Sequence, residues 1–120
     1  MIIKIPLRTP SVNHLYFVWQ GRRIKTTEAR NLEKEIVAIA EKFRGEIPYD
    51  KPLKVCCKIH EDWYYKNGMV RRVDVANREK FLIDAIFEAL GIDDRFIWVE
   101  IISKVQSTRE EKAIVNISVI

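Results

Sequence analysis

The sequence is poor in the residues that mark specialised protein classes. Its 120 residues include only 2 cysteines, 4 glycines and 4 prolines, and the cysteines, Cys56 and Cys57, are adjacent. Neighbouring side chains in a strand point to opposite faces, so this pair suits neither an intrachain disulfide nor a shared metal. We expect both to be packing residues in a strand. Without a disulfide framework, a cytoplasmic location is expected.

Long hydrophobic runs are also lacking. No apolar run approaches the roughly 20 residues that span a bilayer, and the segment 1–5 is too short for a secretory signal because Pro6 follows it. We therefore expect no membrane partner. The composition, with 48% hydrophobic and 32% charged residues, is that of one globular domain over residues 1–120. A formal charge of +4 permits a polyanionic partner without requiring one.

Hydrophobic periodicity predicts three strands, a helix, a strand, a second helix and two final strands. The strands are expected at 2–7, 16–19, 22–25, 53–60, 96–105 and 113–120, and residues 70–73 can extend a strand. The helices are expected at about 26–44 and 75–90. Gln20-Gly21 suits a hairpin turn, and Gly45 and Gly91 follow the helices. This order predicts a single α+β domain, with a mixed or antiparallel sheet and two main helices.

Residues suited to catalysis gather around the second predicted helix. Carboxylates bind hard divalent cations, arginines bind phosphate, and a lysine can stabilise developing negative charge. Together these types suit a metal-dependent enzyme that acts on a phosphodiester backbone. In order along the chain they are Arg71, Arg72, Asp74, Asn77, Lys80, Asp84, Asp93 and Asp94.

Asp74 and Asp94 lie at opposite ends of this helix. A helix over 75–90 is roughly 24 Å long, which is too far for the two carboxylates to share one ion. Either the chain folds back after the helix, or the helix pairs antiparallel with its copy about a two-fold axis. The second arrangement brings Asp74 of one subunit to Asp94 of the other. The broad apolar stripe of the helix favours a dimer through this helix.

Each residue also has an ordinary structural explanation. Asp74 suits a helix N-cap, and Asp93-Asp94 after a glycine is a common turn composition. Lys80 can pair with Asp84 four residues later, and the two arginines can form a solvated patch. Only the spacing of the whole set favours an active site.

That spacing resembles the RusA family of Holliday junction resolvases. The family carries an N-terminal Pro-Ser-x-Asn segment, which residues 10–13 match, with Tyr16 nearby. Its later motif, an arginine-rich stretch followed by Asp-x-Asp-Asn-x-x-Lys, is matched by residues 71–80 except at one position. Asp84 matches an aspartate on the helix, and residues 93–94 match the Asp-Asp pair before a strand. The resemblance covers essentially the whole chain.

The resemblance implies a homodimeric endodeoxyribonuclease that resolves four-way DNA junctions by paired nicks in recombination and repair. It implies Mg²⁺ as the cofactor, with Mn²⁺ as a substitute. It assigns essential carboxylates to Asp74 and Asp94 and an essential lysine to Lys80.

One position departs from the family motif. The second aspartate of the Asp-x-Asp pair is Ala76 here, and alanine has no oxygen that binds a metal. Asp84 or Asp93 can compensate, as can the Asn77 carbonyl or water molecules, which Mg²⁺ tolerates in its shell. We therefore expect a retained but attenuated nuclease, with a weak or dead site as the alternative.

Basic residues and amides around the motif are the predicted DNA contacts. Such contacts bind phosphates without reading sequence, and their affinity falls with salt. Trp63, Tyr64 and Tyr65 can stack at an opened junction or, equally, pack against the protein. The DNA-binding set is Arg71, Arg72, Asn77, Asn13, Arg22, Arg23 and Lys66.

Three classes of function remain at this point. The first is a structure-specific endodeoxyribonuclease, and the second is a homologue that holds branched DNA but has lost cleavage through Ala76. The third is a small structural or regulatory dimer without nucleic acid. Net charge does not separate them, because each class tolerates a basic surface.

Overall fold

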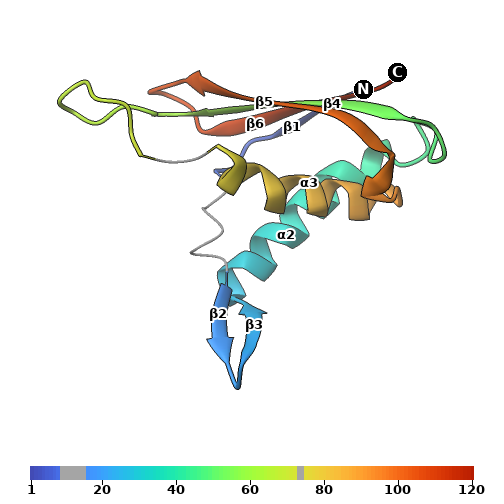
Figure 1. The fold of residues 1–120 in the computed structure, drawn as a ribbon, viewed down its shortest axis with the longest axis horizontal. Helices are drawn as coiled ribbons and strands as arrows, with labels where there is room; N and C mark the ends of the chain where they lie inside the picture. The colour runs from blue at the N-terminus through green and yellow to red at the C-terminus, as the bar shows by residue number, and fades with distance from the viewer. Residues whose placement is uncertain (9–15, 73–74) are drawn as a thin grey trace.

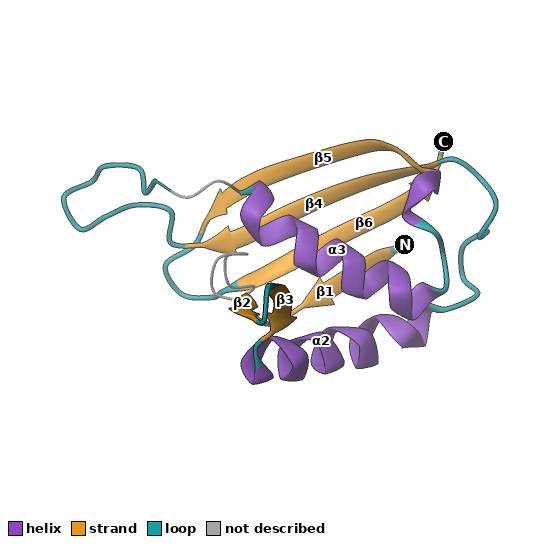
Figure 2. Ribbon diagram, turned by 60° about the horizontal axis from the view of Figure 1, so that its bottom comes forward, coloured by secondary structure: helices purple, strands orange, loops and turns teal. Residues whose placement is uncertain are grey.

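Two helices cover one face of a four-stranded sheet in the computed structural model, which describes residues 1–8, 16–72 and 75–120 (Figures 1 and 2). A separate two-stranded hairpin projects from the helical side of the molecule (Figure 1). The elements are β1 (Ile2–Ile5), β2 (Tyr16–Trp19), β3 (Arg22–Lys25), α2 (Thr27–Ala40), η1 (Glu41–Phe43), β4 (Leu53–Glu61), α3 (Ala76–Leu90), η2 (Asp94–Phe96), β5 (Ile97–Gln106) and β6 (Lys112–Val119).

The sheet is mixed, with the strand order β1-β6-β4-β5. β6 runs antiparallel to both of its neighbours, β1 and β4, whereas β4 and β5 are parallel. A parallel pair needs a crossover between its strands, and α3 provides it. The α+β prediction with two main helices is therefore confirmed, and the sheet is the mixed one of the two predicted kinds.

Alternation along the strands determines which face the helices cover. On β4 the residues Leu53, Val55, Cys57 and Ile59 are buried, whereas Lys54 and Lys58 between them are exposed. Successive strand residues point to opposite faces, so one face joins the core and the other meets solvent. Burial raises the pKa of the Cys57 thiol to about 12, which agrees with a packing role.

The breadth of the apolar stripe on α3 is explained within one chain. α3 packs against the sheet on one side and α2 on the other (Figure 2). Its buried residues belong to a single core cluster, whereas Lys80, Asp84 and Glu88 form its exposed row. The stripe is therefore buried within one chain and is no evidence for a second subunit.

Most predicted boundaries hold to within a few residues. β1 ends at Ile5 rather than Leu7, and the first helix ends at Ala40 before a 3-10 turn. Where an extension at 70–73 was predicted, an isolated bridge joins Tyr64 to Val70. Thr26 caps α2, because its hydroxyl accepts a hydrogen bond from the Ala29 amide at 3.1 Å.

The second helix starts one residue later than predicted. α3 begins at Ala76 with Val75 in the N-cap position, while Asp74, the predicted cap, lies outside the described residues. Gly91 ends the helix in the left-handed conformation, with φ of 69°, as its position predicted. Within the described part of the chain, no helix is long and apolar enough to cross a membrane.

Candidate active site

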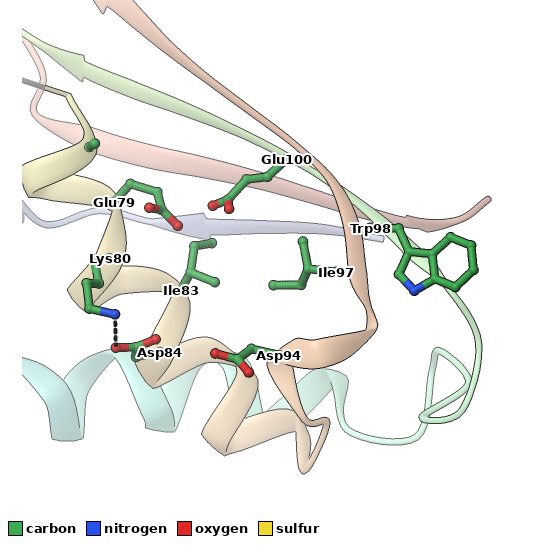
Figure 3. Close-up of a pocket in the computed structure, with 9 residues that line it drawn as sticks. Glu79, Lys80, Ile83, Asp84, Asp94, Ile97, Trp98 and Glu100 are labelled. Atoms are coloured by element: carbon green, nitrogen blue, oxygen red, sulfur yellow. Dashed lines mark ion pairs between the residues drawn. The ribbon is translucent and has the colours of Figure 1, made fainter.

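A polar groove lies between α3 and the start of β5 (Figure 3). Its volume is about 390 Å³. Four of its lining residues carry a carboxyl group and one carries an amine, so the groove concentrates the side chains that bind metals and transfer protons. The lining residues are Ala76, Glu79, Lys80, Ile83, Asp84, Asp94, Ile97, Trp98 and Glu100.

The chain folds back after α3, and this turn brings Asp94 into the groove. Gly91 reverses the chain, and η2 begins at Asp94 before β5 runs alongside the helix. Asp94 therefore shares the groove with Lys80 and Asp84 within one chain (Figure 3). Asp74 lies outside the described residues, so both arrangements that helix length allowed for Asp74 and Asp94 stay predictions.

Lys80 and Asp84 face each other across one turn of α3. The Lys80 Nζ atom lies 3.9 Å from Asp84 Oδ2, and both side chains are largely exposed. This is the surface ion pair that the i,i+4 spacing allowed, and such pairs contribute little to stability. The amine is consequently held in the groove by a weak interaction from which a substrate can displace it.

Glu79 and Glu100 form a second carboxyl pair that the motif did not reveal. Glu79 on α3 is buried, with 9% of its surface exposed, and its carboxyl shares a hydrogen bond with that of Glu100 on β5. Burial, this hydrogen bond and the nearby charges of Glu100 and Asp84 raise the pKa of Glu79 to about 8. No sequence signal joins positions 79 and 100, because only the packing of α3 beside β5 makes them neighbours.

Asp93 has a structural role at the start of η2. Its Oδ1 atom accepts a hydrogen bond from the Arg95 amide at 2.9 Å, which caps the turn. Its neighbour Asp94 lines the groove, whereas Asp93 is not among the lining residues. The metal-binding role predicted for Asp93 stays a prediction.

Oxygen ligands are plentiful in the groove, although they are not gathered into a finished cation site. Among the residues that the structure describes, no three aspartate, glutamate, histidine or cysteine side chains are arranged to hold a metal. The carboxylates of Asp84, Asp94 and the Glu79–Glu100 pair nevertheless have the donor chemistry that Mg²⁺ and Mn²⁺ prefer. Ala76, at the first position of α3, contributes no oxygen from its side chain.

The predicted DNA contacts lie on three separate parts of the molecule. Arg22 and Arg23 are exposed on the projecting hairpin, and Lys66 is exposed in the long loop that follows β4 (Figure 1). Arg71 and Arg72 lie at the end of that loop, before α3. Asn77 is in the first turn of α3, but its side chain, like Asn13, falls outside what the structure describes.

The aromatic cluster after β4 divides into packing and exposed residues. Trp63 is only 2% exposed, and its indole N–H donates to the Ile59 carbonyl oxygen at 3.1 Å. The ammonium of Lys104 lies 4.8 Å from the centre of its ring. Trp63 is thus a packing residue, and stacking on DNA is left to the exposed Tyr64 and Tyr65.

A known protein family matches nearly the whole chain. The family model described as Endodeoxyribonuclease RusA matches residues 6–118, which is nearly the whole chain and includes every residue of the groove. No curated protein matches the sequence.

Proposed function

The chain belongs to the RusA family of endodeoxyribonucleases, and on that basis we propose that it resolves four-way DNA junctions by paired, metal-dependent nicks. The observation that carries the proposal is the groove itself. Lys80 pairs with Asp84 there, and Asp94 lines the same groove. Arg71 and Arg72 precede the helix that carries Lys80. Metal-dependent cleavage of a phosphodiester needs carboxylates that hold the metal ion and basic groups that bind the phosphate and stabilise its charge.

A divalent cation would supply activated water and offset charge on the scissile phosphate. Asp74 and Asp94 are the proposed principal ligands, with Asp84 as a further carboxylate in the same groove. Mg²⁺ is the proposed ion and Mn²⁺ its substitute, because both prefer oxygen ligands.

Lys80 is the proposed catalytic amine. Its exposed ammonium can leave Asp84 and stabilise the oxygen that departs when the strand is cut. Because both side chains are exposed and their ion pair is weak, little free energy is needed to separate Lys80 from Asp84.

DNA would be held by arginines, lysine and amides that surround the groove. Arg71 and Arg72, which precede α3, are proposed contacts, and Arg22 and Arg23 on the hairpin and Lys66 in the loop after β4 are proposed to extend the basic surface. Asn13 and Asn77 complete the proposed set through hydrogen bonds to the backbone. Contacts of this type fix the position of DNA without selecting a sequence.

Paired nicks require two active sites, and a homodimer would provide them. The family resemblance implied the homodimer, and the proposed interface involves α3, as the antiparallel pairing of this helix with its copy would require. Light scattering on the purified chain tests whether the dimer forms. A single-chain mass at all concentrations that support cleavage would contradict the dimer. A cytoplasmic location is proposed with it, because the substrate is cellular DNA.

A second function is favoured by one specific observation. Ala76 occupies the groove where the motif has a carboxylate, and loss of a ligand weakens a cation site. The second candidate is therefore a protein that holds branched DNA without cutting it. The third class, a structural or regulatory dimer without nucleic acid, has no support from the groove or from the family match.

The decisive experiment measures cleavage of a labelled synthetic four-way junction with and without Mg²⁺ or Mn²⁺. Wild-type protein is compared with Asp94→Asn, and Asp50→Asn, an exposed loop residue outside the groove, is the matched control. Symmetric nicks that need the metal and disappear only in Asp94→Asn support the resolvase. Tight junction binding without nicks in any metal supports the second candidate, and absence of selective binding rejects both.

A further inference from the structure

A carboxylate occupies a core position at the end of β4. Residue 61 continues the buried face that Leu53, Val55, Cys57 and Ile59 form, and Glu61 is accordingly only 1% exposed. An isolated charge in such a position is costly, so it must be matched by cations or strong hydrogen-bond donors. Glu61 does not line the groove, and the proposed reaction does not use it.

Three arginines from three chain segments converge on this carboxylate. Arg78, in the first turn of α3, places Nε at 3.2 Å from Oε1, and its side chain is only 5% exposed. Arg71, from the loop before α3, reaches Oε2 at 3.5 Å. Arg8, just after β1, reaches the same Oε2 atom at 3.5 Å.

The three arginines differ in how far their side chains are exposed to solvent. Arg78 is buried with Glu61, whereas 24% of the Arg71 side chain and 41% of the Arg8 side chain are exposed. Arg71 is fixed further by donating from Nη1 to the Asp62 carbonyl oxygen at 2.7 Å. Arg8 also lies 3.6 Å from Glu111. One buried pair thus supports two arginines at the surface.

The contacts of the two exposed arginines with Glu61 are long. Charge-assisted hydrogen bonds between arginine and carboxylate are about 2.7–2.9 Å, whereas these contacts are 3.5 Å. Arg78 Nη2 also lies 3.5 Å from this oxygen, so the two exposed arginines share with a third guanidinium group an oxygen that neither of them binds closely. Such an arrangement attracts an anion, because a phosphate can accept close hydrogen bonds from both guanidinium groups.

We propose that Glu61 is a positioning residue that holds Arg8 and Arg71 as a two-arginine clamp for one phosphate of the DNA backbone. Arg78 anchors the clamp to the first turn of α3, the helix that carries Lys80. The phosphate bound there sets the distance between the DNA strand and the groove. The inference rests on the proposed function, since DNA is the anion that it assigns to the clamp.

The direction in which one substitution changes DNA affinity distinguishes the clamp from a general attraction between the basic protein and DNA. Glu61→Gln removes a negative charge, so general attraction to DNA predicts tighter binding. The clamp predicts the opposite, about tenfold weaker binding to a four-way junction, because Arg8 and Arg71 lose their common support. Glu110→Gln makes the same charge change at an exposed residue that pairs with Lys112, and it should bind DNA at least as tightly as wild type.

A second variant keeps the test valid if Glu61→Gln does not fold. Glu61→Leu combined with Arg78→Leu removes the buried pair and leaves the net charge unchanged, and apolar replacements of buried pairs are well tolerated. The melting temperature of this double variant should match that of wild type, yet its affinity for the four-way junction should fall about tenfold. The salt dependence should fall too: with about 0.9 units of slope per phosphate contact, losing the one phosphate that the clamp binds lowers the slope by about 0.9.

Coupling between residues gives a readout that a purely structural role would not change. Arg71→Ala should weaken junction binding about tenfold in the wild-type background and only slightly in the double leucine variant, where the clamp is already lost. A folded double variant that binds as tightly as wild type, with an unchanged salt slope, overturns the clamp alone. A wild-type protein that does not bind the junction overturns the proposed function, and the clamp with it.

Discussion

Glu79 on α3 and Glu100 on β5 are hydrogen bonded to each other through their carboxyl groups, in the groove that Lys80 and Asp94 also line. Two carboxyl groups can share a hydrogen bond only while one of them keeps its proton. The pair is therefore a proton-binding element in a region that the family motif reserves for metal ligands. Its consequences extend to stability and to pH dependence.

The first prediction concerns pH and stability. The pKa of Glu79 is raised from its ordinary value of 4.5 to about 8. Between these values the folded chain holds a proton that the unfolded chain has released. The free energy of unfolding should therefore fall as pH rises from about 4.5 to 8 and level off above 8.

Glu79→Gln removes this contribution. The variant should melt at a less pH-dependent temperature and be more stable than wild type at pH 8.5, by on the order of 1–2 kcal/mol. Thermal melts between pH 5 and 9 measure the difference. Glu46→Gln, at an exposed loop position, is the control, and identical pH profiles for wild type and Glu79→Gln would contradict the assignment.

The second prediction concerns the missing aspartate of the motif. Ala76→Asp adds a carboxylate to the groove, which should lower the Mn²⁺ concentration needed for half-maximal cleavage by about tenfold, or roughly 1.4 kcal/mol. An acidic residue at the start of a helix is itself favourable, so stability should not fall. Ala38→Asp on the exposed surface of α2 matches the charge change. An unchanged metal requirement in Ala76→Asp would mean that position 76 does not contact the ion.

The third prediction separates catalysis from stability at Lys80. Because its pair with Asp84 is exposed and 3.9 Å long, Lys80→Gln should change the free energy of unfolding by less than about 0.5 kcal/mol. Cleavage should nevertheless fall at least 100-fold at saturating DNA, as expected for loss of a group that stabilises the leaving oxygen. Single-turnover cleavage measures this, with Lys34→Gln on α2 as the control. Full activity in Lys80→Gln would remove Lys80 from the mechanism.

The fourth prediction tests the division within the aromatic cluster. Trp63→Ala should destabilise the fold by about 3–5 kcal/mol, because a buried ring and its hydrogen bond to Ile59 are lost. Tyr65→Ala should change stability by less than about 1 kcal/mol, since that ring is 48% exposed. Urea denaturation measures both. Comparable losses for the two variants would show that Tyr65 is packed in solution.

Local pattern alone predicted the hairpin correctly. The predicted strands 16–19 and 22–25 match β2 and β3, because Gln20-Gly21 supplies a turn in which both residues have positive φ. The end of α3 was predicted correctly, because Gly91 is a local signal for it. Such features depend on residues a few positions apart, and the sequence contains them directly.

The broad stripe of α3 shows where sequence reasoning reached its limit. Its apolar pattern predicted burial correctly, but it did not say whether the covering surface belongs to the same chain or to another. The structure assigns that surface to the sheet and α2. Periodicity reports which side of a helix is buried, whereas the identity of the partner depends on how distant segments pack.

The sequence by itself determined the types of the catalytic candidates, the order of the elements and the family motif with its Ala76 departure. Tertiary structure alone decided that Asp94 returns to the groove of Lys80, that Glu79 meets Glu100, and that three arginines surround Glu61. The physical reason is the same in each case. Spacing along a chain constrains neighbours within a helix turn or a strand, while contacts between remote residues exist only after the sheet and helices have packed.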